Sequence, residues 1–277
     1  MPAAAPATSD QTAGQISAKA TPDTGDAVWS LPIIDRPYVL PKSRLQAYAD
    51  TPIVHTAATT GTTPTASDTS FGLHLGAGYG VTDKITAGLE YSFAFYDFEI
   101  KGPLAVFGEY QLLHKERLSV AASADVTFDF DGTNSTGGNA LDVGVHAGVG
   151  ARYLVAPKMA VYTGSPYGPG PVGRQFNVPT DGDNAITFDL PLGFAYQALP
   201  QLFAYADTRV LQVNIANKGM NDDTAVIIGS DTGGVPLTLG GLYTLTRVLD
   251  ITAALVSPDL TDFGDKWGVS VGARWHN

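Results

Sequence analysis

Apolar residues alternate with small or polar residues along residues 71–95, whose sequence is FGLHLGAGYGVTDKITAGLEYSFAF. Because the side chains of a strand point alternately to its two faces, this alternation predicts two strands joined by a turn at residues 81–84. One face of the hairpin is wholly apolar and has aromatic residues at its ends, whereas the other is small, polar or charged. A soluble sandwich can produce such alternation too, but the long runs and aromatic ends favour a hairpin whose apolar face contacts lipid.

The same pattern recurs through the rest of the chain and predicts about twelve antiparallel strands. Long loops alternate with short turns between them, and a slip in the phase of the ninth strand near residues 207–209 predicts a bulge. The expected strands cover residues 44–55, 71–81, 84–95, 103–114, 118–130, 141–153, 159–163, 186–196, 202–215, 235–245, 249–256 and 267–275. A soluble sandwich or an eight-stranded ligand barrel would rarely keep one apolar face across so many strands.

The composition of the chain excludes several kinds of partner and of site. Only 16% of the residues are charged, and the net charge of −11 argues against a nucleic-acid partner. The absence of cysteine excludes disulfides and thiolate metal sites. No apolar run approaches the length of roughly 18 residues that a membrane helix needs. No signal peptide is visible at the start, so we interpret the chain as a mature form with an added initiator Met.

The repeated hairpins and the last strand, WGVSVGARW at residues 267–275, resemble Gram-negative outer-membrane β-barrel proteins. The resemblance covers about residues 42–275 and implies an all-β, antiparallel up-and-down transmembrane barrel of about twelve strands. It also implies surrounding outer-membrane lipid and lipopolysaccharide, with the short turns and both termini in the periplasm. Members commonly end on an aromatic residue that the insertion machinery recognises, but here His276 and Asn277 follow Trp275.

The chain divides into an N-terminal segment, residues 1–40, and the expected barrel, residues 41–277. Residues 1–26 are rich in Ala, Thr, Ser, Pro and Asp, so we expect residues 1–27 to be mobile and sensitive to protease. Residues 28–37, VWSLPIIDRP, are apolar but interrupted by prolines, which predicts an extended segment and no central strand. The favoured interpretation is a periplasmic linker, and the second is a plug or a docking peptide for a periplasmic or envelope protein.

Candidate lumenal residues follow from the alternation and the pairing of strands. The motif GLHLGAG at residues 72–78 recurs as GVHAGVG at 144–150, so both central histidines should point inward. Pairing across a loop at residues 98–101 sets Glu90 opposite Glu109, within one pair of residues, and the preceding turn sets His74 opposite Glu90 or Ser92. Two facing carboxylates then need a protonated histidine, an arginine across the lumen, a cation or a shared proton.

A second cluster is expected where Asp125 lies opposite or diagonal to His146, with Asp129 near Asp142. The favoured interpretation of both clusters is a salt-bridge network that fills a narrow barrel, and the alternative is an acidic waist that selects cations. The candidate lumen-lining residues are His74, Glu90, Glu109, Asp125, His146, Arg152 and Arg274.

No motif predicts catalysis, a metal or a cofactor. Asp129 opens a sequence like a calcium loop, but the glutamate required at the twelfth position is missing. Glycine pairs lie inside strands, so they do not predict a phosphate loop. A lipid-facing hydrolase at the rim is the third choice, because both candidate histidines point inward. The first is a narrow passive pore for small solutes or cations, and the second a non-transporting barrel that acts as an anchor or a subunit of a multi-protein envelope complex.

Overall fold

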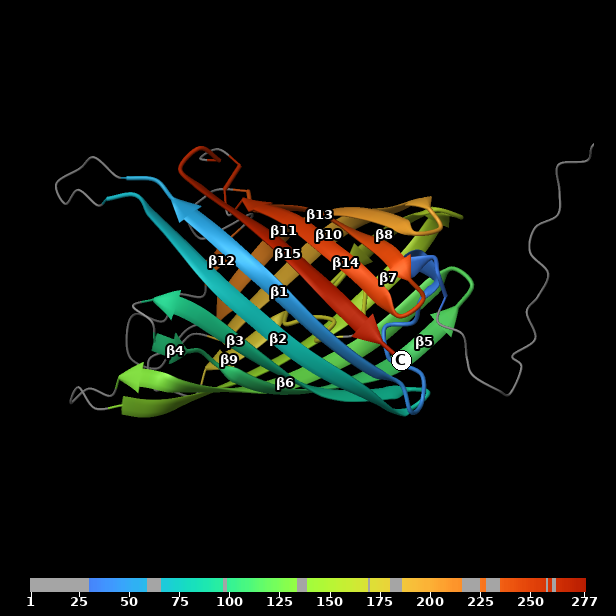
Figure 1. The fold of residues 1–277 in the computed structure, drawn as a ribbon, viewed down its shortest axis with the longest axis horizontal. Helices are drawn as coiled ribbons and strands as arrows, with labels where there is room; N and C mark the ends of the chain where they lie inside the picture. The colour runs from blue at the N-terminus through green and yellow to red at the C-terminus, as the bar shows by residue number, and fades with distance from the viewer. Residues whose placement is uncertain are drawn as a thin grey trace, which may run out of the picture.

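The structure is a computed structural model. It describes residues 30–58, 66–96, 99–133, 139–168, 170–179, 186–215, 225–227, 235–257, 259–260 and 263–277. Within these residues, twelve antiparallel strands form a closed barrel, because β1 pairs with β2 on one side and with β15 on the other (Figure 1). The fold class expected from the alternation is therefore confirmed.

Each predicted strand is confirmed to within three residues at either end. The twelve strands of the barrel are β1 (Leu45–Thr56), β2 (Asp68–Thr82), β3 (Ile85–Tyr96), β5 (Leu104–Lys115), β6 (Leu118–Thr133), β7 (Asn139–Ala156), β8 (Met159–Thr163), β10 (Ile186–Leu199), β11 (Leu202–Ile215), β13 (Leu237–Thr246), β14 (Leu249–Ser257) and β15 (Lys266–His276). Three short strands extend the wall: β4 (Glu99–Lys101), β9 (Phe176–Pro179) and β12 (Ala225–Ile227). The expected bulge lies at Val210, since Leu190 pairs with Leu211 and Pro191 with Arg209.

The outer face of the barrel is apolar. Large apolar side chains are exposed along most strands, among them Leu89, Val106, Val145, Leu192 and Val271. An apolar surface of this extent, repeated around a closed barrel, is the surface that a transmembrane barrel presents to lipid. The described part of the chain contains no helix long and apolar enough to cross a membrane.

Residues 30–43 are here called the plug segment; residues 33, 34, 36 and 38–40 are buried inside the barrel, whereas Lys42 and Ser43 are exposed at its end. A 3-10 helix, η1 (Ile33–Asp35), begins the segment, and Tyr38 and Leu40 are fully buried. Main-chain N–H groups of the segment donate to side chains of three strands: Ile34 to Gln197 at 3.1 Å, Tyr38 to Gln111 at 3.0 Å and Leu40 to Thr86 at 2.7 Å. These wall residues all lie near the short turns, so the plug segment crosses that end of the barrel, where it is drawn in blue near the C-terminus (Figure 1).

Residues 30–40 pack against the inner wall of the barrel, although prolines interrupt their sequence. Prolines remove some main-chain donors, and inward-facing amide and hydroxyl side chains accept from donors that remain. Its apolar residues then bury against the inner wall, where Ile33 and Ile34 pack with Phe203 and Leu242. Residues 1–29, including the part expected to be protease-sensitive, lie outside the described residues.

A second segment, here called the inward loop (residues 164–168 and 170–175), also enters the lumen. It separates β8 from β9, and both of these strands pair with β7 and β10 as two parts of one wall strand. No strand was expected between residues 163 and 186, whereas β9 continues the wall within this connection. Gln175 bridges the gap in the wall, because its side chain accepts from the N–H of Val149 at 2.7 Å and donates to its carbonyl at 2.8 Å.

The plug segment and the inward loop pack on each other. Val172 of the loop is fully buried in a cluster with Tyr38 and Ala121. Gly168 approaches the main chain of Tyr38 so closely that an added Cβ would lie 2.0 Å from its carbonyl oxygen. Two layers of non-wall chain therefore obstruct the lumen.

Candidate functional site

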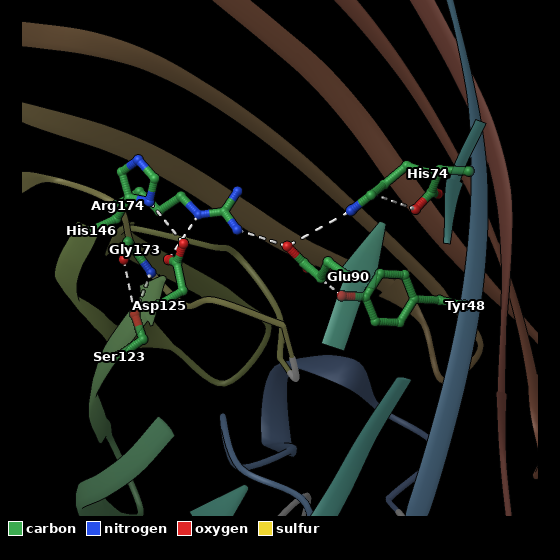
Figure 2. A network of polar contacts seen from close by, with 9 residues as sticks. Tyr48, His74, Glu90, Ser123, Asp125, His146, Gly173 and Arg174 are labelled. Carbon is green, nitrogen blue, oxygen red and sulfur yellow. Dashed lines mark hydrogen bonds and ion pairs between the residues drawn. The ribbon is translucent and has the colours of Figure 1, made fainter. Parts of the chain in front are cut away.

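Arg174 of the inward loop spans the lumen between two carboxylates that lie on different strands. Its Nε donates to Asp125 Oδ2 of β6 at 2.9 Å, and its Nη2 donates to Glu90 Oε2 of β3 at 2.8 Å. Figure 2 shows the guanidinium between these two carboxylates. The side chain of Asp125 is fully buried and that of Glu90 is 7% exposed, so both charges depend on this arginine for compensation.

Each carboxylate also faces a histidine. His146 Nδ1 lies 2.8 Å from Asp125 Oδ1, and His74 Nε2 lies 3.7 Å from Glu90 Oε2. The other ring nitrogen of His74, Nδ1, lies 3.9 Å from Asp50 Oδ2 on β1. We call the set of Asp50, His74, Glu90, Asp125, His146 and Arg174 the lumenal array, and Figure 2 labels its members other than Asp50. The repeated histidine motif thus supplies one histidine to each end of the array.

Hydroxyl groups fix two of the carboxylates. Tyr48 donates its hydroxyl to Glu90 Oε1, and its ring lies edge-on to that of His74 with centroids 5.6 Å apart. Thr252 on β14 donates to Asp50 Oδ1 at 2.9 Å. The array is therefore a continuous polar network across the lumen. Within the described residues, no group of three or more histidine or acidic side chains is arranged to hold a metal ion.

The strand register tests the pairs expected from the sequence. Three of them are confirmed as directly opposed partners: His74 with Ser92, Asp125 with His146, and Asp129 with Asp142.

The expected pairing of Glu90 with Glu109 is wrong. Glu90 pairs with Ala105, and Glu109 pairs with Thr86, so the register differs by two residue pairs from the expected one. The cause is β4, which pairs with the end of β3 although residues 98–101 were assigned to a loop. Since the turn comes earlier, every residue of β5 shifts along β3 and the acidic waist built on these two glutamates does not form. Glu109 is instead buried beside Gly170 and Val172 of the inward loop.

The two candidate arginines of the wall contact the obstructing segments. Arg152 is buried and donates to the main-chain carbonyl of Pro166 in the inward loop at 3.1 Å and to that of Arg36 in the plug segment. Its guanidinium also lies 5.2 Å from the ring centroid of Tyr38. Arg274 lies over the rings of Tyr48 and Tyr167, at 4.9 and 4.5 Å.

A separate ion pair holds the plug segment to the wall. Arg36 Nη1 donates to Asp250 Oδ2 on β14 at 2.5 Å, and both side chains are at most 5% exposed. Arg36 also donates to Thr244 at 3.2 Å and to the carbonyl of Ser30 at 2.7 Å, while His276 Nε2 lies 3.7 Å from the same carboxylate. His276 is the last residue of β15, and its buried side chain joins this cluster, whereas Trp275 before it is exposed.

Two cavities lie on the two sides of the obstruction. The first, of about 420 Å³, borders the lumenal array and is lined by Asp50, His74, Ser92, Tyr167, Arg174, Tyr205, Thr252 and Ser270, with small apolar residues between them. The second, of about 440 Å³, is lined by Ile34, Asp35, Arg152 and the turn at residues 114–119. The two cavities share no lining residue.

Arg174 was not among the residues expected from the sequence. One of the options for compensating paired carboxylates was an arginine across the lumen, and the structure supplies it from a loop. A long connection rich in glycine and proline was the available signal, because loops of that length inside a compact fold are commonly functional.

Comparisons with known proteins identify a shared fold. No protein-family model matches the sequence, and no curated protein matches it. An outer-membrane channel from Pseudomonas putida F1 is 15% identical with a TM-score of 0.55, covering 92% of this chain and 99% of its own. The KdgM porin is 8% identical with a TM-score of 0.48, covering 82% and 98%, and Omp33 of Acinetobacter baumannii is 13% identical with a TM-score of 0.40, covering 84% and 98%.

The closed barrel, its apolar outer face and the fold shared with the Pseudomonas putida protein define the class. The chain is a transmembrane β-barrel of the outer-membrane type, with a polar lumen that two of its own segments obstruct.

Proposed function

We propose that the protein is a narrow passive pore for small solutes in the outer membrane, held closed in this structure by the plug segment and the inward loop. The observation that carries the proposal is the origin of the obstruction. It consists of two segments outside the wall, which are held by side-chain contacts to the wall, both ion pairs and buried apolar packing, rather than by the strand pairing of the barrel.

The wall itself supports a passage once these segments move. Glycines at inward positions of β2 and β7 contribute no side-chain volume, for example Gly76, Gly78, Gly148 and Gly150. A twelve-stranded barrel is also wider than the eight-stranded type, whose interior side chains fill completely. The cavity beside the lumenal array is polar on one part of its surface and apolar on another, which suits small solutes of mixed character.

In this proposal the short turns and both termini face the periplasm, and lipid and lipopolysaccharide surround the barrel. Residues 1–29 then lie on the periplasmic side, where an envelope protein can bind them and displace the plug segment from the lumen. The second candidate function, a non-transporting anchor or subunit of an envelope complex, uses the same segment as a permanent attachment.

A reversible tether of the plug segment tests the proposal. The chain has no cysteine, so the variant Leu40→Cys/Thr86→Cys carries a single engineered pair at a contact where Leu40 N lies 2.7 Å from Thr86 Oγ1. We expect single-channel currents in planar bilayers from the wild type and from a variant that lacks residues 1–43. The oxidised tethered variant should be silent, and a reducing agent should restore its currents.

The matched control is Val126→Cys/Val145→Cys, which joins two directly paired residues of the wall. Its currents should not respond to oxidation or reduction. If neither the reduced variant nor the protein without residues 1–43 conducts at any voltage, the pore is refuted and the anchor remains.

A further inference from the structure

We propose that Arg174 determines the charge selectivity of the lumen, and that the inward loop carries this determinant with it when it moves. The inference rests on the proposed pore, since selectivity concerns the solutes that pass. It assigns the decisive charge to a loop, although the other five residues of the lumenal array belong to the wall.

The position of Arg174 is fixed on both sides by its neighbours in the loop. Ser123 of the wall donates its hydroxyl to the carbonyl of Gly173 at 2.8 Å, and the N–H of Gly173 approaches the same hydroxyl at 3.2 Å (Figure 2). Gln175, on the other side, is bonded twice to Val149. The guanidinium is therefore held in place by the loop as well as by its two carboxylates, and it lines the cavity with 39% of its side chain exposed.

The charges of the array give the direction of the effect. With neutral imidazoles, the carboxylates of Asp50, Glu90 and Asp125 contribute −3 and Arg174 contributes +1, so the array carries −2. Nearby Glu109 and Arg274 are the same in every variant compared, so they do not affect the difference between variants. Removal of the guanidinium charge changes the array to −3, and fixed negative charge raises the local concentration of cations.

The same count distinguishes two states of the barrel. With the loop inside, Arg174 covers Asp125 and Glu90 and the preference for cations is weak. With the loop displaced, both carboxylates face the passage without the arginine. The open state is therefore the more cation-selective state, because opening and loss of the counter-charge are the same movement.

The electrostatic potential of the cavity can be measured without any current. Ser270 lines the cavity opposite the loop, and Ser270→Cys creates one thiol in a chain that otherwise has none. The measurement is the ratio of its reaction rates with a cationic and an anionic methanethiosulfonate reagent of similar size, at pH 8, where histidine is uncharged. By Coulomb's law in water, a unit charge lost at a separation of about 8 Å should change this ratio roughly fivefold.

In the Ser270→Cys background, Arg174→Gln should raise the ratio roughly fivefold in favour of the cationic reagent, whereas Arg174→Lys should leave it within about twofold of the parent. Arg209→Gln is the matched control, because Arg209 is an inward arginine that pairs with Asp189 at 3.4 Å and does not line this cavity. It should not change the ratio.

An unchanged ratio in Arg174→Gln overturns the inference, and so does an equal change in Arg209→Gln. If the ratio changes as expected and no variant conducts, the potential is assigned correctly while the proposed pore fails. Where currents are obtained, they arise in the open state, from which Arg174 has moved, so the reversal potential of Arg174→Gln in a salt gradient should equal that of the wild type. A shift of the reversal potential overturns the part of the inference in which the loop carries the arginine out of the passage.

Discussion

The ion pair between Arg36 and Asp250 should control how long the plug segment stays in the barrel. Replacing Arg36 with Met keeps much of the aliphatic length of the side chain but removes the cation from a pair whose members are 5% and 1% exposed. Asp250 is then left buried, with His276 at 3.7 Å as its nearest remaining ionisable group.

The cost can be worked out from this burial. Removing one partner of a buried ion pair costs about 3–5 kcal/mol, because the other charge stays desolvated without compensation. We take the lower end, about 3 kcal/mol, acting on the equilibrium between the docked and the displaced plug. This free energy corresponds to about a 150-fold increase in the population of the displaced state.

The assay is the fraction of time that single barrels conduct in a planar bilayer, together with the rate at which trypsin cleaves after Lys42 in detergent. Both should rise in Arg36→Met. The double variant Arg36→Met/Asp250→Leu removes both charges and should regain most of the protection, since an apolar pair of similar volume replaces the ion pair without leaving a buried charge.

Unchanged cleavage and unchanged currents in Arg36→Met would refute the reasoning. If the double variant conducts and is cleaved as much as the single one, contacts other than charge compensation, such as those to Thr244 and Ser30, hold the segment.

Two further predictions concern the outer face and the plug. Val145→Arg places a charge on the exposed face near the middle of β7 and should lower the stability of the folded barrel in lipid by about 2–4 kcal/mol. The control Val145→Met should leave the stability unchanged. Equal stabilities of the two variants in bilayer unfolding experiments would contradict the lipid-facing assignment. Burial raises the pKa of Tyr38 to about 12, so its contribution to plug docking is fully present below pH 10 and is lost as the pH rises through 12. Currents should therefore increase between pH 10 and pH 12 in the wild type and not in Tyr38→Phe. Identical pH profiles of the two proteins would contradict this role of Tyr38.

The strands were predictable because each follows one local rule. Alternation with a period of two, read between turns, determines both the bounds of a strand and the side that faces lipid, and neither depends on distant residues. The same rule identified the inward direction of His74 and His146 and the pairing of Asp125 with His146, because the intervening hairpin keeps its register. Even the bulge was visible as a slip in phase.

The features that could not be predicted from the sequence depend on the geometry of turns and on contacts between distant residues. The pairing of Glu90 with Glu109 failed because the ends of a hairpin decide its register, and the few residues of β4 were enough to move it by two pairs. Arg174 was missed, and the plug was only the second interpretation of residues 28–37, for a different reason. Both are irregular segments whose positions are determined by partners far away in the chain, and no periodic pattern marks such partners.

The plug segment also has a consequence for the order of assembly. Its contacts join residues that are 163 positions apart in the pair Ile34–Gln197 and 214 apart in Arg36–Asp250, so they span most of the chain. Pairings of such high sequence separation form late, because the entropy of closing the loop must be lost before the contact stabilises anything. The seam between β1 and β15 joins residues equally far apart, such as Gln46 and His276, so closure of the wall and docking of the plug segment both belong to the last stage of assembly. The first residues of the barrel to be synthesised therefore wait for the last ones before they reach their final place.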